Sequence, residues 1–204
     1  YLGSAGVGRI TLVDHDTVDL TNLQRQIAHT TQRVGQSKVD SARAAVEAIN
    51  PDTKIDALKQ RADDAFLELW LPKIDVVLDC SDNFATRQMV NAACVRHRKP
   101  LVSGAAIRFD GQVSVYDSRD AHSPCYACVF PPDSSFEEIN CATMGVFAPL
   151  VGIIGTVQAA EALKLITGVG RSLAGRLQML DARAMEWNEV QVPRNQKCLV
   201  CGHH

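Results

Sequence analysis

The stretch from Ile74 to Asn83, IDVVLDCSDN, decides the fold class. Its first seven residues are mostly apolar and β-branched, as is typical of a strand buried inside a sheet. The polar pair Asp82 and Asn83 follows at the point where this strand ends. Ligands of open α/β sheets bind beyond the carboxyl ends of the strands. The stretch therefore predicts a strand of an α/β sheet with polar ligand-binding groups at its end.

Strands and helices alternate on both sides of this stretch, which indicates a parallel sheet covered by helices. The predicted elements before it are a strand over Arg9–Asp14, a helix over Gln36–Asn50, a strand over Lys54–Leu58 and a helix over Ala62–Leu71. After it, the pattern predicts a helix over Thr86–Arg98 and a strand over Leu101–Ala106.

The last predicted strands have no crossover helices between them, which favours an antiparallel extension of the sheet. They cover Gln112–Asp117, Arg176–Asp181 and Trp187–Val192. Residues 121–143 read as a long loop. We therefore expect an α/β, Rossmann-like, mostly parallel sheet with antiparallel C-terminal strands, and a single domain over residues 1–204.

The composition predicts an ordinary globular protein that does not bind nucleic acid. The net charge of −2 offers no electrostatic attraction for nucleic acid. The longest apolar run, Val146–Ile166, contains Gln158, Glu161 and Lys164, so a buried helix is favoured over a membrane span. Because no secretory signal is visible, we expect a cytoplasmic protein.

Four of the seven cysteines form two CxxC pairs, Cys125 with Cys128 and Cys198 with Cys201. Two such turns can surround one metal ion with four thiolates, the ligand set of a structural zinc site. The alternatives are a dithiol redox pair and four unrelated cysteines. Neither pair lies at a strand-to-helix junction, where thioredoxin-like motifs occur. We predict one structural zinc ion, Zn²⁺, held by Cys125, Cys128, Cys198 and Cys201.

A second group of polar residues suits a nucleotide. Asp14 ends a predicted strand, where an acid typically accepts hydrogen bonds from ribose hydroxyls, although it could equally form a turn. Asp82 and Asn83 can hold Mg²⁺ and a phosphate or base edge, or Asp82 can cap the next helix. Arg25 and Lys38 are candidate phosphate ligands, or are merely solvated cations.

No glycine-rich phosphate loop occurs in the expected place. The glycines of Gly3–Gly8 precede a predicted strand, whereas the dinucleotide fingerprint follows one. We expect that the sequence begins inside the first crossover helix and that the first strand and phosphate loop are missing.

Several stretches resemble the MoeB/ThiF family of adenylyltransferases in the order of that family. They are DHDTVDLTNLQRQ (14–26), GQSKVDSAR (35–43), LDCSDNFATR (78–87), PLVSGAAIRFDGQ (100–112), CYAC (125–128), NCATMGVFAPLVGIIGTVQAAEALKLITG (140–168) and CLVCG (198–202). The resemblance covers essentially the whole chain. Ubiquitin-activating enzymes share this fold more distantly.

The resemblance implies an enzyme that uses ATP and Mg²⁺ to adenylate the C-terminal Gly carboxylate of a ubiquitin-like sulfur-carrier protein. The adenylated carrier is then converted to a thiocarboxylate for molybdopterin or thiamine biosynthesis. In motif order, Asp14 resembles the ribose ligand, Asn22 and Arg25 resemble nucleotide and phosphate contacts, and Lys38 resembles the triphosphate lysine. Asp82 resembles the Mg²⁺ ligand, with Asn83 beside it.

Cys141 matches a position where some family members hold a cysteine that bonds to the activated carrier or to sulfur, and a buried or incidental thiol is the alternative. The resemblance further implies a homodimer, a MoaD-like or ThiS-like carrier and a sulfur-donor protein. The arginine that the family lends across its dimer interface has no counterpart at the start of this sequence, which we expect to be a fragment.

Two other functions remain to be separated from adenylation. A NAD-dependent oxidoreductase would need a dinucleotide fingerprint and would give the TNLQRQ stretch and the CxxC pairs no role. A catalytically inactive module that only binds the carrier is the second alternative.

Overall fold

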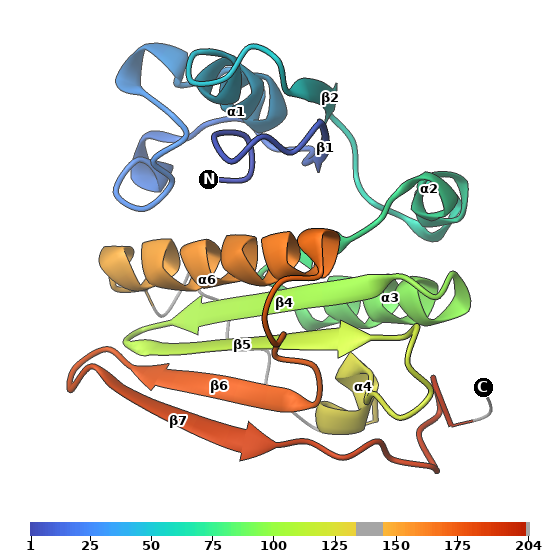
Figure 1. Cartoon of the computed structure of the whole chain (residues 1–204). Helices are drawn as coiled ribbons and strands as arrows, with labels where there is room; N and C mark the ends of the chain where they lie inside the picture. The colour runs from blue at the N-terminus through green and yellow to red at the C-terminus, as the bar shows by residue number, and fades with distance from the viewer. Residues whose placement is uncertain (134–144, 203–204) are drawn as a thin grey trace. The chain divides into compact units, whose positions relative to one another are not determined.

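The computed structural model describes residues 1–133 and 145–202. The chain divides into two compact units, Tyr1–Ala62 and Asp63–His204. Each unit has its own strands and helices, which are labelled along the chain in Figure 1. The units are therefore treated one at a time, and the expectation of a single domain over residues 1–204 stays a prediction.

The first unit is built on a parallel pair of strands, β1 (Arg9–Val13) and β2 (Lys54–Leu58). The α1 helix (Lys38–Glu47) lies between them in sequence, after the short 3-10 helices η1 (Leu20–Asn22) and η2 (Thr31–Arg33). β2 has the predicted bounds, β1 ends one residue before the predicted end at Asp14, and α1 lies within the predicted helix Gln36–Asn50. The parallel pairing with a helix in the connection is the expected βαβ arrangement.

The glycine-rich start of the chain precedes β1, as the sequence indicated. Gly3 has a packing role there, because a Cβ atom at this position would lie 2.4 Å from Cγ1 of Val46 on α1. The carbonyl of Gly3 accepts hydrogen bonds from Asn50 Nδ2 at 2.8 Å and Thr53 Oγ1 at 3.2 Å. Gly3 thus ties the chain to the end of α1 and the turn before β2.

The second unit contains a five-stranded sheet in the order β3-β4-β5-β6-β7. The strands are β3 (Val77–Asp79), β4 (Pro100–Ile107), β5 (Asp110–Asp117), β6 (Arg176–Asp181) and β7 (Glu186–Gln191). β3 pairs parallel with β4, and the other neighbours pair antiparallel. The α/β class and its antiparallel C-terminal extension are confirmed. Since antiparallel pairings predominate in this sheet, mixed describes it more closely than mostly parallel.

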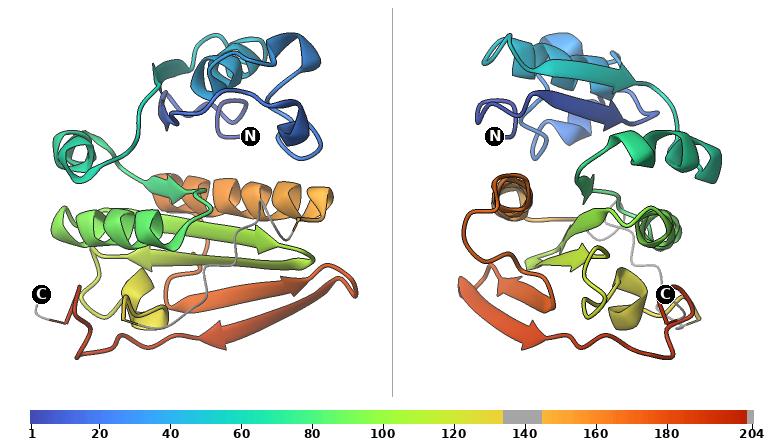
Figure 2. Two further views of the ribbon diagram at one scale, coloured as in Figure 1. Left: turned by 180° about the vertical axis from the view of Figure 1, so that it is seen from behind. Right: turned by 45° about the vertical axis from the view of Figure 1, so that its right-hand side comes forward.

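Two long helices of the second unit, α3 (Phe84–Arg96) and α6 (Ala148–Thr167), lie on opposite sides of the sheet (Figure 2). A Cβ atom at Gly111 of β5 would lie 2.8 Å from Leu150 and from Ile154 of α6, so the glycine allows close helix packing. By length and composition α6 could cross a membrane. It nevertheless packs on β4 and β5 and buries Gln158 and Glu161, as predicted for a core helix.

The shorter helices complete the second unit. They are α2 (Asp64–Trp70), η3 (Leu71–Lys73) and α4 (Tyr126–Val129). α4 lies within the stretch predicted as a loop and begins directly after Cys125, so the first CxxC pair folds as one helical turn. α3 begins two residues earlier than predicted because Asn83 caps it, and it ends at Arg96, just before Arg98 takes a left-handed φ of 51°.

Candidate functional site

The two CxxC pairs of the second unit come together, as the sequence predicted. The Sγ atoms of Cys125, Cys128, Cys198 and Cys201 all lie within 4.8 Å of one another, and all four residues are free thiols. The Sγ of Cys125 lies 3.9 Å from that of Cys128 and 3.7 Å from that of Cys198, and Cys128 and Cys201 are 3.4 Å apart. A tetrahedral site with Zn–S bonds of about 2.3 Å has edges of roughly 3.8 Å. The spacing fits a metal and is far too long for a disulfide of about 2.05 Å.

The surroundings of the cluster stabilise one thiolate, that of Cys128. Asn91 Nδ2 donates to Cys125 Sγ at 3.6 Å, and the backbone N–H of Asn195 donates to Cys128 Sγ at 3.4 Å. A hydrogen bond from the Cys125 thiol lowers the pKa of Cys128, the same hydrogen bond raises the pKa of Cys125, and burial raises the pKa of Cys201. When several thiols lie this close together, one is deprotonated and the others stay protonated, because neighbouring negative charges repel each other. A bound dication would favour deprotonation of the remaining thiols as well.

Gly202 makes the second CxxC turn possible. Its N–H donates to the carbonyl of Cys198 at 2.8 Å. A Cβ atom at Gly202 would lie 2.5 Å from that carbonyl oxygen and 2.6 Å from the carbonyl oxygen of Gln196. Because both neighbours are backbone atoms, only glycine fits without moving the turn. The fifth residue of CLVCG is therefore fixed by the geometry of the cysteine cluster.

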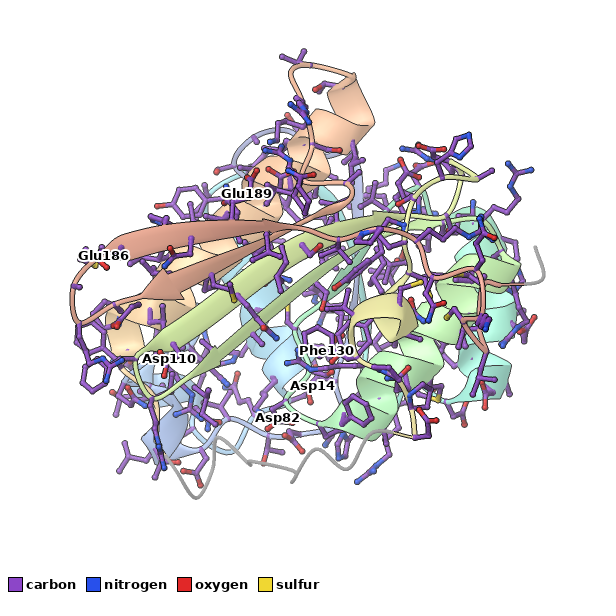
Figure 3. All side chains as sticks on the ribbon, turned by 90° about the horizontal axis from the view of Figure 1, so that it is seen from below. Asp14, Asp82, Asp110, Phe130, Glu186 and Glu189 are labelled. Atoms are coloured by element: carbon purple, nitrogen blue, oxygen red, sulfur yellow. The ribbon has the colours of Figure 1, made fainter. Side chains whose placement is uncertain are left out.

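The two polar residues after β3, Asp82 and Asn83, have different roles. Asn83 is the N-cap of α3, and its Oδ1 accepts from the N–H of Thr86 at 2.8 Å. Asp82 lies just before the helix (Figure 3) and is exposed. Among the described residues, its side chain has no hydrogen bond or ion pair. The alternative that Asp82 caps the helix is therefore wrong, and its carboxylate stays available to a ligand.

In the first unit, the end of β1 gathers two acids and a lysine. Lys38 Nζ lies 2.8 Å from Asp16 Oδ2 and 3.9 Å from Asp14 Oδ2. Asp14 Oδ1 also accepts the N–H of Asp16 at 2.8 Å, so Asp14 does form a turn. The hydrogen bond from Lys38 holds the pKa of Asp16 below its ordinary value. Asp14 and Lys38 were predicted, whereas Asp16 was missed although it stands two residues after the strand end.

Asn22 and Arg25 both contact the backbone of their own loop. Asn22 Oδ1 accepts from the N–H of Asp19 at 3.1 Å, and Asp19 Oδ1 accepts from the N–H of Thr21 at 2.8 Å, so the two side chains cap η1 reciprocally. Arg25 Nη1 donates to the carbonyl of Thr21 at 3.3 Å. The nucleotide contacts predicted for Asn22 and Arg25 stay predictions, and Asn22 has a capping role that the sequence analysis did not identify.

The predicted nucleotide residues are thus distributed over both units. Asp14, Asn22, Arg25 and Lys38 belong to the first unit, and Asp82 and Asn83 belong to the second. Asp14 and Lys38 lie together within their unit, and Asp82 and Asn83 are neighbours within theirs. Cys141, the predicted covalent residue, lies outside the described residues.

Comparison with known proteins identifies the family. The model of the ThiF family matches residues 1–200. The chain is 47% identical over 204 residues to the molybdopterin-synthase adenylyltransferase of Escherichia coli, and it covers 80% of that protein. The chain belongs to the ThiF family. The sequence motifs predicted membership of the MoeB/ThiF family, and this prediction is confirmed.

Other relatives agree with this assignment. The chain is 42% identical over 202 residues to the sulfur carrier protein ThiS adenylyltransferase of Escherichia coli, of which it covers 79%. It is 43% identical over 207 residues to the sulfur carrier protein adenylyltransferase of Thermus thermophilus, of which it covers 76%. For each of these, 99% of this chain is aligned.

Solved structures share the fold of this ThiF-family chain. Escherichia coli MccB, solved with ATP, superposes with a TM-score of 0.84 at 22% identity. The match covers 98% of this chain and 61% of MccB, so the chain spans less than two thirds of that structure. At this identity the likeness establishes the fold alone.

Proposed function

We propose that the chain is an adenylyltransferase that transfers AMP from ATP to the C-terminal glycine carboxylate of a ubiquitin-like sulfur-carrier protein. The observation that carries this proposal is the relation to curated adenylyltransferases at 42–47% identity over almost the whole chain. Their names assign two carriers, that of molybdopterin synthase and ThiS. A MoaD-like or a ThiS-like carrier therefore suits the proposal.

The reaction activates a poor acyl donor. An oxygen of the carrier carboxylate attacks the α-phosphate of ATP, and a new P–O bond forms. The bond from the α-phosphorus to the bridging oxygen breaks, and its electron pair leaves on pyrophosphate. The product is an acyl adenylate, whose AMP leaves far more readily than the original oxygen. Fixed cations around the phosphates stabilise the charge that develops on the leaving group.

Residues of both units supply groups for this chemistry. We assign Asp14 to the ribose, Lys38, Arg25 and Asn22 to the phosphates, and Asn83 to the nucleotide beside Asp82. The exposed carboxylate of Asp82 offers the hard oxygen ligand that Mg²⁺ prefers. When bound, Mg²⁺ offsets the negative charge of the phosphates. The ion pair of Lys38 with Asp16 keeps the ammonium group at the end of β1.

The cysteine cluster has a structural role in this proposal. Four thiolates complete the tetrahedral coordination of Zn²⁺ and leave no open position for a substrate. Zinc there would join the 125–128 turn to the C-terminal residues 198–201 and close a long chain loop. Metal analysis of freshly reduced protein should give one zinc per chain.

The remaining assignments follow the family and belong to the same proposal. Cys141 is proposed to react in one of two ways, within a cytoplasmic homodimer. Its thiolate attacks the carbonyl carbon of the carrier adenylate and displaces AMP to form a thioester, or it attacks the outer sulfur of a persulfide on a donor protein, whose thiolate leaves. A Cys141→Ala variant would then lose sulfur transfer and keep adenylation. Static light scattering would give twice the chain mass for a homodimer.

One assay separates the enzyme from its alternatives. ATP–pyrophosphate exchange should occur only when a carrier ending in Gly-Gly is present, and it should stop when the last glycine is deleted. An inactive carrier-binding module would bind the carrier without exchange, and an oxidoreductase would show neither. Carrier binding without exchange in the full-length protein would contradict the proposal.

A further inference from the structure

Among the described residues, the Asp82 side chain has no hydrogen bond or ion pair, while the residues before and after it, Ser81 and Asn83, are held by hydrogen bonds. Such an arrangement has the form of a preorganised functional group, whose supporting residues fix its position before a ligand arrives. The supporting contacts come from β3, α3 and α6, all within the second unit.

Two hydrogen bonds fix the backbone of Ser81, the residue directly before Asp82. Asp79 Oδ1 accepts the N–H of Ser81 at 2.9 Å, and Arg87 Nη2 donates to the carbonyl oxygen of Ser81 at 2.5 Å. Asp79 and Arg87 are themselves buried, with 5% and 9% of their surface exposed. On the other side of Asp82, Asn83 caps α3. The backbone of Asp82 thus lies between two anchored residues.

A third contact fixes the end of β3 itself. Gln158 of α6 is buried, and its Nε2 donates to the carbonyls of Asp79 at 2.9 Å and Val102 at 3.2 Å. The amide therefore bridges β3 and β4. Gly104 leaves room for it, since a Cβ atom there would lie 2.4 Å from the Gln158 amide.

Stability alone does not explain an acid at position 79. Burying a carboxylate carries a large desolvation penalty, and a neutral side-chain oxygen could accept the Ser81 N–H without that penalty. Among the described residues, Asp79 Oδ2 is buried and has no hydrogen-bond partner. A charged acceptor makes a stronger hydrogen bond to a backbone N–H group than a neutral one. An acid at position 79 therefore makes the turn more rigid, although its burial costs folding stability.

We propose that Asp79, Arg87 and Gln158 are positioning residues that hold the Asp82 carboxylate in the geometry needed to bind the metal–nucleotide complex. This inference rests on the proposed function, because it assigns Asp82 to the metal. The three residues act through Ser81 and the end of β3 and need not touch the nucleotide themselves.

The test uses the full chain with its carrier and compares Asp79→Ala with Asp79→Asn. The alanine removes the acceptor for Ser81, whereas asparagine keeps an oxygen in its place. Glu161→Gln is the control, because Glu161 is a similarly buried acid on α6 that pairs with Lys164 and accepts the N–H of Leu173, away from the turn. Readouts are kcat of ATP–pyrophosphate exchange, KM for the carrier, Mn²⁺ affinity measured by electron paramagnetic resonance with a non-hydrolysable ATP analogue, and the melting temperature.

We expect Asp79→Ala to lower kcat about 100-fold and to weaken Mn²⁺ binding at least tenfold, while KM for the carrier stays within about twofold. Asp79→Asn should recover only part of the loss, because its amide oxygen accepts the Ser81 N–H without the charge, and Glu161→Gln should keep the kcat and Mn²⁺ affinity of the unaltered chain. In an Asp82→Asn background, Asp79→Ala should have no further effect, because a positioning residue acts only through the group it positions.

Three results would overturn the inference: unchanged Mn²⁺ affinity in a folded Asp79→Ala protein, an equal further loss in the Asp82→Asn background, or a matching loss in Glu161→Gln. If Asp79→Ala does not fold, Arg87→Lys replaces it, because lysine keeps the charge but lacks the reach of the guanidinium, and the same outcomes apply. Full activity of Asp82→Asn would instead contradict the proposed function.

Discussion

At the scale of single residues, adjacent polar side chains have separate roles. Asn83 caps α3 through its Oδ1, whereas Asp82 is exposed and unpaired among the described residues. The sequence identified both as site residues, but it could not tell which one capped the helix, because both types are good N-caps. In the same way, Asp14 combines its predicted place at a strand end with a turn to Asp16.

The cap and the proposed nucleotide contact of Asn83 can be separated by mutation. Serine caps helices about as well as asparagine, so Asn83→Ser should keep the melting temperature. The substitution also removes the Nδ2 donor. If that amide contacts the nucleotide, ATP should bind about tenfold more weakly, because one or two hydrogen bonds are lost. Titration calorimetry with ATP measures this. Asn83→Ala should in addition destabilise the protein by about 1 kcal/mol.

Lys38 should matter for catalysis far more than for folding. Its ion pair with Asp16 is partly exposed, and such pairs contribute at most about 1 kcal/mol. We expect Lys38→Met to lower ATP–pyrophosphate exchange about 100-fold, in the range for removal of one group that stabilises transition-state charge.

Two further measurements check the Lys38 prediction. The pKa of Asp16 should rise toward its ordinary value in Lys38→Met, since the lysine hydrogen bond lowers it, and NMR titration detects the change. The matched control is Arg43→Met, which removes another cation of α1 paired with Asp40 at 2.8 Å. Equal losses of exchange in the two variants would contradict a phosphate role for Lys38.

At the scale of elements, α3 connects the cysteine cluster with the Asp82 turn. Near its middle, Asn91 accepts the N–H of Tyr126 at 2.8 Å and donates to Cys125, while at its start Arg87 holds Ser81. Burial raises the pKa of Tyr126, and a hydrogen bond from Arg87 opposes that effect. The first CxxC turn therefore packs against the helix that presents Asp82.

Gly202 provides the sharpest test of the cysteine cluster. A Cβ atom there meets backbone oxygens of Cys198 and Gln196, so Gly202→Ala should distort the second CxxC turn. We expect zinc content to fall below one per chain and the melting temperature to drop. Gly152→Ala is the control, because no atom lies within 4 Å of a Cβ atom there, and alanine favours a helix. Normal zinc content in Gly202→Ala would show that the turn does not hold a metal as proposed.

Most elements could be predicted because hydrophobic periodicity and breaker residues mark them. β2 and β6 have the predicted bounds, and α6 was expected from its apolar run. The strand predicted over Ile74–Cys80 is shorter, since β3 pairs with β4 only over Val77–Asp79. Pairing with the neighbouring strand sets where a strand ends, and the local sequence pattern carries no information about that pairing. The four-thiol cluster was predictable from CxxC spacing, whereas the contacts of Asp79, Arg87 and Gln158 depend on packing between elements.

At the scale of the whole molecule, the proposed chemistry needs groups from both compact units. Asp14 and Lys38 come from the first, and Asp82 and its supporting residues come from the second. The order of motifs along the chain, together with identities of 42–47% to adenylyltransferases, supports their joint action. Substitutions of these residues in either unit should then slow the same step, the formation of the acyl adenylate.

The most direct measurement is the intact mass of a Gly-Gly carrier after incubation with the full-length protein and Mg²⁺-ATP, quenched in acid. We expect a carrier heavier by one AMP, which forms far more slowly with Lys38→Met and with Asp82→Asn, whereas Arg43→Met forms it at the unaltered rate. A carrier that stays unmodified with the unaltered protein, or an adenylate that forms undiminished in both Lys38→Met and Asp82→Asn, would contradict it.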